Sequence, residues 1–254
     1  MNVRIGSRTD RGRKRSINED SLYCNESVRL FVLADGMGGH RTGEVASRMA
    51  VETIAEHFKE TLPSNNYLAS EGYKKEFSRE TNKLAISIRV ANYKIYETAQ
   101  KRPECYGMGA TIVSVLLTGY VLSVAYVGDS RIYLIRDKTI IQLTADHSLV
   151  SEQLKRGLIS EKEARESRLR NVITRALGTE KSVEIGLDEQ VILDNDYILM
   201  CSDGLYDMVK DSEILSVVLG FPKQPQKACD HLIELSNEHG GNDNMSVILL
   251  HLSK

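Results

Sequence analysis

The chain has 254 residues, a formal net charge of −2, 41% apolar and 27% charged residues, and a pI of about 6.3. This length suits one large domain or two small ones, and the composition is ordinary for a soluble globular protein. The slightly acidic balance argues against a dedicated nucleic-acid surface, which is usually basic.

The first third of the chain predicts three strands and two long helices. The expected strands cover residues 3–7, 21–25 and 30–34. Apolar residues recur every four positions from Ala46 to Phe58, which predicts a helix over 43–61, with Thr42 as its cap. Residues 63–72 have the composition of a loop, and a second helix is expected over 73–100.

Residues 110–128 carry no charge and are nearly long enough to span a bilayer. Thr118 and Gly119 interrupt this stretch, which is rich in β-branched residues, so two strands joined by a tight turn explain it better than a membrane helix. Two more strands are expected at 131–136 and 139–143, joined by a turn at Asp137 and Lys138.

The second half of the chain mixes short helices with strands. Residues 147–175 are polar and helix-prone in short pieces, and we interpret them as a flap. The remaining strands are expected at 182–185, 190–193, 197–201 and 245–252, and short helices at 211–219 and 226–239. Because strands and helices do not alternate strictly, two antiparallel sheets covered by helices fit better than a doubly wound parallel sheet.

Cysteine content and the start of the chain bear on the cellular compartment. The four cysteines form no C-x-x-C pair, so a zinc or thioredoxin-like site has little support. The first residues lack the basic and apolar segments of a secretory signal. We therefore expect a protein of the reducing cytoplasm.

Aspartates at the ends of apolar strands are the strongest functional signal. They are Asp35 after 30–34, Asp129 after 124–128, Asp203 after 197–202, and Asp243 before 245–250. A carboxylate at the edge of an apolar layer loses hydration at a cost of several kcal/mol, and several together repel one another. A hard divalent cation offsets both effects, and all-oxygen ligands favour magnesium or manganese over zinc.

Each of these acidic positions has a simpler interpretation when it is taken alone. Asp-Gly at 203–204 and Asp-Asn at 243–244 are typical of ordinary turns, and Asp129 could be a turn residue paired with Arg131. Four such positions, each at the end of an apolar strand, favour a shared metal cluster instead.

Two loops complete the candidate site. The glycine-rich segment 35–40 joins a strand to a helix, where glycines let the backbone approach a ligand, although it is neither a Walker nor a G-x-G-x-x-G motif. Arg15 offers a guanidinium fork for phosphate, unless it is only part of a solvated basic loop. Glu19 and Asp20 could hold metal-bound waters or simply pair with the cations nearby.

Seven segments, taken as an ordered set, resemble the bacterial form of the metal-dependent protein serine/threonine phosphatases of type 2C. They are residues 15–20, 35–40, 109–111, 128–131, 174–178, 202–207 and 243–246. The resemblance covers almost the whole chain. It implies an α+β fold, a four-layer αββα sandwich of two antiparallel β-sheets flanked by helices. It also implies a single catalytic domain over 1–254 with a flap at about 147–175.

The resemblance implies a metal site with two Mn²⁺ or Mg²⁺ ions in its core. Asp35 matches the ligand that bridges both ions, and the Gly36 carbonyl matches a ligand of one of them. Asp203 and Asp243 match ligands of the other. Asp129, together with Asp203, matches a third and weaker metal position.

The resemblance assigns catalytic roles as well. Arg15 matches the phosphate-binding arginine, and Glu19 and Asp20 match groups that hold metal-bound water. Met37 stands where some eukaryotic members carry a histidine proposed as the general acid. The proton for the leaving group could then come from His40, from a metal-bound water, or be unnecessary for an acidic leaving group.

The implied activity is hydrolysis of phosphoserine and phosphothreonine through a metal-bridging hydroxide that attacks phosphorus in line. The expected partners are phosphoproteins, namely a cognate serine/threonine kinase and its substrates, with no nucleic acid or membrane, and the expected state is a monomer. Two alternatives stay open. One is a non-catalytic phosphoprotein-binding module, against which the four retained aspartates count. The other is a phosphatase dedicated to a single regulator, such as an anti-sigma antagonist.

Overall fold

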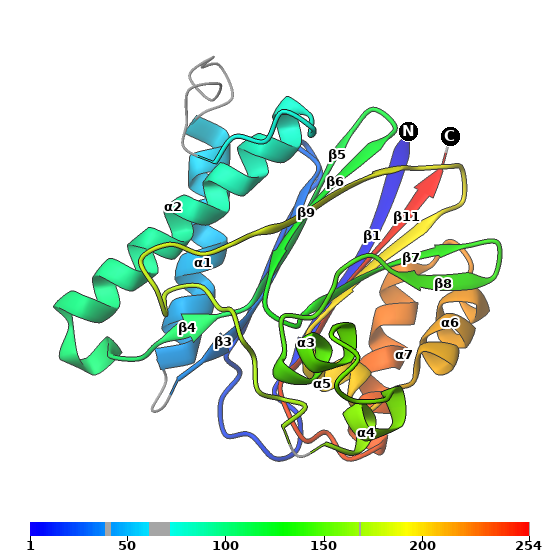
Figure 1. The fold of residues 1–254 in the computed structure, drawn as a ribbon. Helices are drawn as coiled ribbons and strands as arrows, with labels where there is room; N and C mark the ends of the chain where they lie inside the picture. The colour runs from blue at the N-terminus through cyan, green and yellow to red at the C-terminus, as the bar shows by residue number, and fades with distance from the viewer. Residues whose placement is uncertain (39–41, 61–71, 168, 254) are drawn as a thin grey trace.

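The computed structural model describes residues 1–38, 42–60, 72–167 and 169–253. Two antiparallel sheets stack face to face, and helices cover the outer face of each (Figure 1). The first sheet has five strands in the order β1-β11-β10-β7-β8. Their bounds are β1 Asn2–Asp10, β7 Arg131–Arg136, β8 Thr139–Gln142, β10 Tyr197–Cys201 and β11 Met245–Ser253.

The second sheet has six strands. Five follow the order β2-β3-β5-β6-β9, and the short β4 also pairs with β3. Their bounds are β2 Asp20–Asn25, β3 Leu30–Met37, β4 Gly109–Ala110, β5 Ile112–Thr118, β6 Val121–Val127 and β9 Gly186–Val191. Every named strand pairing in both sheets is antiparallel.

Two long helices cover the six-stranded sheet and two shorter ones cover the five-stranded sheet (Figure 1). The first pair is α1 Thr42–Glu60 and α2 Arg79–Lys101, and the second is α6 Asp211–Gly220 and α7 Pro225–Glu238. Short helices follow near the sheet ends: α3 Leu149–Lys155, α4 Glu161–Glu166 and α5 Asp203–Tyr206. This arrangement confirms the predicted four-layer αββα sandwich.

Three apolar layers hold these four layers of structure together, and β3 shows how the sequence makes them. Leu30 and Val32 pack in the layer beneath α1 and α2, whereas Phe31 and Leu33 pack between the two sheets. Successive strand residues point to opposite faces, so a strand buried on both faces is apolar throughout. The third layer lies under α6 and α7.

Most predicted elements are confirmed, and the uncharged stretch 110–128 is one of them. It forms the antiparallel hairpin of β5 and β6, with Gly119 in the turn at a φ of 62°. Among the described residues, no helix has both the length and the apolarity needed to cross a membrane. The loop predicted at 63–72 falls almost wholly outside the described residues.

Two predicted boundaries are wrong at the start of helices. The second helix starts at Arg79 rather than at 73, because the Ser78 side chain accepts the N–H of Thr81 and so caps the helix. The Asn82 side chain also bonds the carbonyls of residues 74, 77 and 78, which holds the chain before the helix in a loop. Thr42, predicted as a cap, is instead the first residue of α1.

The strand predicted at 182–185 is wrong, and the one predicted at 190–193 is right only at 190–191, because a single strand, β9, runs through the whole gap between the two predictions. It pairs with β6 from Gly186 opposite Tyr126 to Val191 opposite Val121. A Cβ at Gly186 would lie 2.3 Å from the Tyr126 ring, so this glycine lets the strand pass the tyrosine.

The central layer between the sheets should dominate stability. We expect Leu250→Ala, at a side chain with no exposed surface, to lower the free energy of unfolding by about 2–5 kcal/mol, because it leaves a cavity between two sheets. Leu193→Ala, at a side chain that is 50% exposed, is the matched control and should change it by less than about 0.5 kcal/mol. Urea unfolding measures both, and equal losses would contradict this account of the core.

Candidate active site

The predicted acidic residues converge at one end of the sandwich, around a cavity of about 280 Å³. Asp35 lies in β3, directly opposite Asp20 of β2 in the strand register. Asp203 is the first residue of α5, and Asp243 lies just before β11. Asp129 lies in the connection between β6 and β7, so the carboxylates come from five separate segments of the chain.

Close backbone contacts fix the carboxylates, and two glycines make these contacts possible. A Cβ at Gly36 would lie 2.1 Å from the carbonyl oxygen of Gly43, in the first turn of α1. A Cβ at Gly204 would lie 2.1 Å from the carbonyl oxygen of Asn244. Glycine therefore follows Asp35 and Asp203 because their segments pack directly against other backbone.

The carboxylates are poorly hydrated and repel one another. Burial, followed by repulsion from Asp20 and Asp203, raises the pKa of Asp35 well above its ordinary value. Burial and the charge of Asp129 act likewise on the pKa of Asp203. Burial also raises the pKa of Asp20 to about 6, although the Ser202 hydroxyl donates to its carboxylate at 2.9 Å. Excess negative charge at this end is therefore destabilising until a positive charge arrives.

The donor atoms fit a hard divalent cation. The Oδ1 atom of Asp20 and the Oε1 atom of Glu19 are buried without a hydrogen-bond partner among the described residues. The described residues that line the cavity include carboxylates and the backbone of Gly36, and neither histidine nor cysteine. Oxygen donors of this kind suit Mg²⁺ or Mn²⁺.

Arg15 forms a salt bridge with one of these carboxylates, that of Asp243. Its Nη2 atom lies 2.6 Å from Oδ2 of Asp243, and the Arg15 side chain is 53% exposed at the cavity. In the described part of the chain, no three acidic, histidine or cysteine side chains are arranged around a common point as a metal ion requires, so the carboxylates would have to turn toward a cation as it binds. A cation at Asp243 would therefore compete with Arg15.

Asn244 fastens the loop that carries Arg15, a role that the sequence analysis missed. Its Nδ2 atom donates to the carbonyls of Arg11 (3.0 Å) and Ile17 (2.9 Å). Its Oδ1 atom accepts the N–H of Glu19 at 2.8 Å. The only signal in the sequence is an asparagine directly after a predicted ligand, and its partners lie more than 220 residues away along the chain.

Asp129 does not form the ion pair with Arg131 that the sequence left open. Arg131 pairs instead with Asp146, with 2.7 Å between Nη2 and Oδ2, and its guanidinium stacks on the Tyr206 ring at 3.6 Å. The Tyr206 hydroxyl donates to the carbonyl of Asp129 at 3.1 Å. That ion-pair interpretation is wrong, and Asp129 keeps its carboxylate available, with its pKa raised to about 6 by burial.

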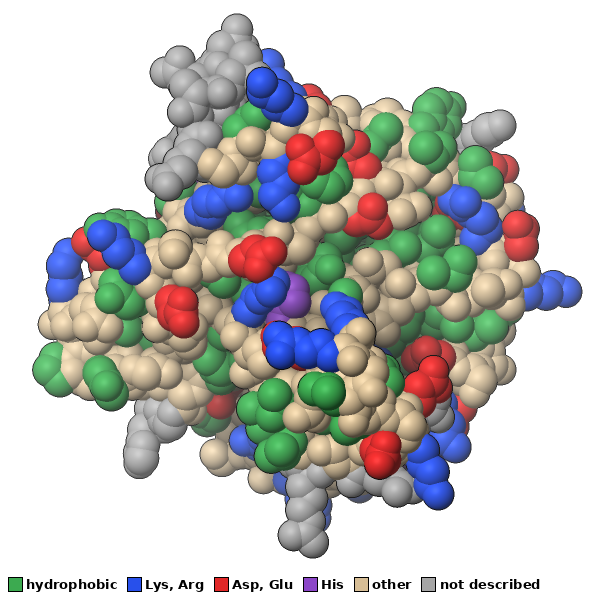
Figure 2. Space-filling view, in the orientation of Figure 1, with side chains coloured by type: hydrophobic (Ala, Val, Ile, Leu, Met, Phe, Trp, Pro, Cys, Tyr) green, Lys and Arg blue, Asp and Glu red, His purple; other side chains and the backbone are tan. Residues whose placement is uncertain are grey.

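Residues 147–175 border the cavity through Asn171 and Ile173. His147 is buried and accepts the N–H of Gly128 at Nδ1, 3.1 Å away, and burial lowers its pKa to about 4. It is therefore a neutral structural residue. Figure 2 shows hydrophobic side chains gathered on the lower part of this face, and this segment contributes exposed Leu154, Leu158, Leu169 and Val172.

The sequence analysis linked Met37 and His40 to the proton that the leaving group requires. Met37 lines the cavity and has no proton to donate. His40 lies outside the described residues, so its role stays a prediction.

Comparison with known proteins agrees with this geometry. The model of the protein phosphatase 2C family matches residues 10–245. The serine/threonine phosphatase stp of Listeria welshimeri is 37% identical over 246 residues, which are 96% of this chain and 93% of that protein.

Solved structures extend the likeness to three dimensions. The serine/threonine phosphatase PstP/Ppp of Mycobacterium tuberculosis matches with a TM-score of 0.86 and 36% identity, over 99% of both chains. The catalytic domain of PstP in complex with two manganese ions matches with a TM-score of 0.83 and 35% identity, again over 99% of both chains. This chain therefore belongs to the protein phosphatase 2C family.

Proposed function

We propose that the chain hydrolyses phosphoserine and phosphothreonine in proteins with the help of two bound divalent cations. The convergence of carboxylates and Arg15 on one cavity carries this proposal. The carboxylates match the positive charge of metal ions, and the guanidinium matches the negative charge of a phosphate. The similarity to PstP, whose catalytic domain is known with two manganese ions, supports the same metal here.

The proposed ligands divide between two core positions for Mn²⁺ or Mg²⁺. Asp35 would be a ligand of both ions, and the Gly36 carbonyl would be a ligand of one of them. Asp203 and Asp243 would hold the other, and Asp129 with Asp203 would hold a weaker third ion. When bound, these cations supply Lewis-acid activation of the attacking water and screen the charge of the phosphate.

The chain's own side chains would then orient the reactants. Arg15 would grip the equatorial phosphate oxygens with its guanidinium fork, where transition-state charge develops. A cation beside Asp243 would loosen the contact between Arg15 and that carboxylate, which frees the guanidinium for phosphate. Asp20 and Glu19 each offer a buried unpaired oxygen, which would accept a hydrogen bond from a water molecule and so orient it.

The proposal extends to the domain organisation, partners and compartment of the protein. We regard residues 1–254 as one catalytic domain with a flap at about 147–175, acting as a monomer on a cognate serine/threonine kinase and its substrates. All four cysteines lie in the described part of the chain and all are free, which supports a reducing cytoplasm as its compartment.

Neutralising a metal ligand should separate stability from function. We expect Asp35→Asn and Asp203→Asn to raise the melting temperature of the metal-free protein, because they remove buried charge repulsion. Both should lower turnover by at least about 100-fold. In the wild type, manganese at 100 times its Kd should add about 2.7 kcal/mol of stability, and the variants should lose this gain.

Thermal unfolding with and without MnCl₂ measures these effects, and a chelator should abolish wild-type turnover. Asp137→Asn, in an exposed turn, is the control and should behave like the wild type. Variants that keep both the manganese-induced stabilisation and the turnover would refute the proposed ligands.

Arg15→Ala should lower kcat/KM by about 10- to 100-fold, because a hydrogen bond to a charged group contributes about 1.5–3 kcal/mol. Arg15→Lys should restore only part of the loss, since lysine lacks the bidentate fork. Steady-state kinetics on a phosphothreonine peptide test this, with Arg13→Ala as the control in the same loop. An Arg15→Ala variant with wild-type kcat/KM would show that phosphate binds elsewhere.

The general acid can be tested through the leaving group. If His40 protonates the leaving oxygen, His40→Ala should slow hydrolysis of a phosphoserine peptide by about 100-fold or more. It should scarcely affect p-nitrophenyl phosphate, whose leaving group needs no proton. An equal effect on both substrates would argue against His40 as the acid.

A further inference from the structure

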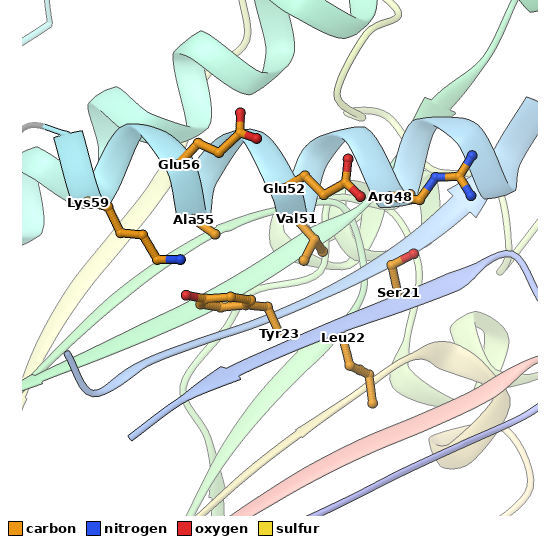
Figure 3. Close-up of a pocket in the computed structure, with 9 residues that line it drawn as sticks. All are labelled: Ser21, Leu22, Tyr23, Arg48, Val51, Glu52, Ala55, Glu56 and Lys59. Carbon is orange, nitrogen blue, oxygen red and sulfur yellow. The ribbon is translucent and has the colours of Figure 1, made fainter. Parts of the chain in front are cut away.

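The strand β2 lies at an edge of the six-stranded sheet, and an open groove runs beside it. The groove lies between β2 and α1, away from the acidic cavity, and has a volume of about 390 Å³ (Figure 3). Val51 and Ala55 of α1 are 5% and 6% exposed and form its apolar wall. Ser21 and Tyr23 face the helix, whereas Leu22 points to the opposite side of the sheet.

The free edge of β2 presents unpaired backbone groups. The N–H of Gly36 donates to the carbonyl of Glu19 at 3.1 Å, which sets the alternation of hydrogen-bonded and non-hydrogen-bonded pairs along β2 and β3. Leu22 and Cys24 fall at non-hydrogen-bonded positions, so their N–H and C=O groups point away from β3. Within the described residues, no backbone outside the sheet bonds to them.

The edge of β1 in the other sheet is covered by a side chain at Ser7, whereas within the described part of the chain the edge of β2 at Leu22 and Cys24 is not. The Gln226 amide accepts the N–H of Ser7 at 3.1 Å and donates to the Ser7 carbonyl at 3.1 Å. Proteins commonly protect edge strands in this way, because an unprotected edge pairs with other strands. An edge that lacks such a cover offers a place for a strand from a partner.

The charges around the groove are partly neutralised within the chain. Arg48 lies 3.6 Å from Glu44, and Glu56 lies 3.8 Å from Lys94. Lys59 makes no salt bridge to a described residue, and its ammonium lies 5.9 Å from the centre of the Tyr23 ring. Glu52 also lines the groove and makes no salt bridge to a described residue. The groove therefore has Val51 and Ala55 at its base, a carboxylate at Glu52 and an ammonium at the Lys59 end.

We propose that this groove binds an extended peptide of a partner protein, which adds a strand to the free edge of β2. The backbone of the peptide would pair with Leu22 and Cys24. Its alternate side chains would face α1, with small apolar groups against Val51 and Ala55 and a carboxylate near Lys59. Main-chain hydrogen bonds would provide affinity and the alternate side chains would provide specificity. Because α1 walls one side of the groove, the space suits a single strand.

Fluorescent heptapeptides of the pattern Thr-X-Thr-X-Thr-X-Thr, with every combination of Val, Ala, Glu and Lys at X, test this directly by anisotropy. We expect the tightest members to combine apolar residues with a glutamate at one end. Cys24→Pro should weaken them by about fivefold or more, because it removes one edge N–H that β3 does not use. Cys24→Ser keeps that N–H and is the matched control. Lys59→Glu should reverse the preference from glutamate to lysine.

Turnover of p-nitrophenyl phosphate should be unchanged in all three variants, which separates this proposal from that of the active site and shows that the variants are folded. The proposal is overturned if no peptide binds, or if Cys24→Pro binds peptides as the wild type does. It is also overturned if light scattering shows a wild-type dimer that Cys24→Pro dissociates, because the edge then pairs with a second copy.

Discussion

The concentration of buried carboxylates at one end of the sandwich is the constraint on which the site depends. Asp20, Asp35 and Asp203 lie where hydration is poor, and burial raises the pKa of each, with a further contribution from repulsion by neighbouring carboxylates. Such an arrangement destabilises the metal-free protein. It becomes favourable when cations supply the opposite charge, so the electrostatic cost and the proposed metal chemistry have the same origin.

Arg15 links the metal site to phosphate recognition. Its guanidinium forms an ion pair with Asp243. The neighbouring Asn244 holds the loop that carries Arg15 through hydrogen bonds to its backbone. The same short segment before β11 therefore supplies a candidate metal ligand, a partner for the phosphate-binding group and the anchor of its loop. A cation that binds at Asp243 would therefore neutralise this carboxylate and weaken its ion pair with the Arg15 guanidinium.

Local signals in the sequence predict much of this structure. The run of apolar residues ending at Asp35 predicts β3 and its buried faces, and the recurrence of aspartates at strand ends predicts which residues converge. The extent of α2 and β9 depends on contacts that no local pattern contains, namely the bonds of Asn82 to the preceding loop and the passage of Gly186 beside Tyr126. Asn244 and the Arg131–Asp146 pair escaped prediction for the same reason, since their partners are set by tertiary structure.

Anomalous diffraction from crystals grown with manganese would test the central claim most directly. We predict two strong peaks in the acidic cavity, one about 2.1 Å from the Asp35 carboxylate and the Gly36 carbonyl and the other at a similar distance from Asp35, Asp203 and Asp243. The Arg15 guanidinium should also move away from Asp243. Crystals without a peak in this cavity, with the contact between Arg15 and Asp243 unchanged, would contradict the account.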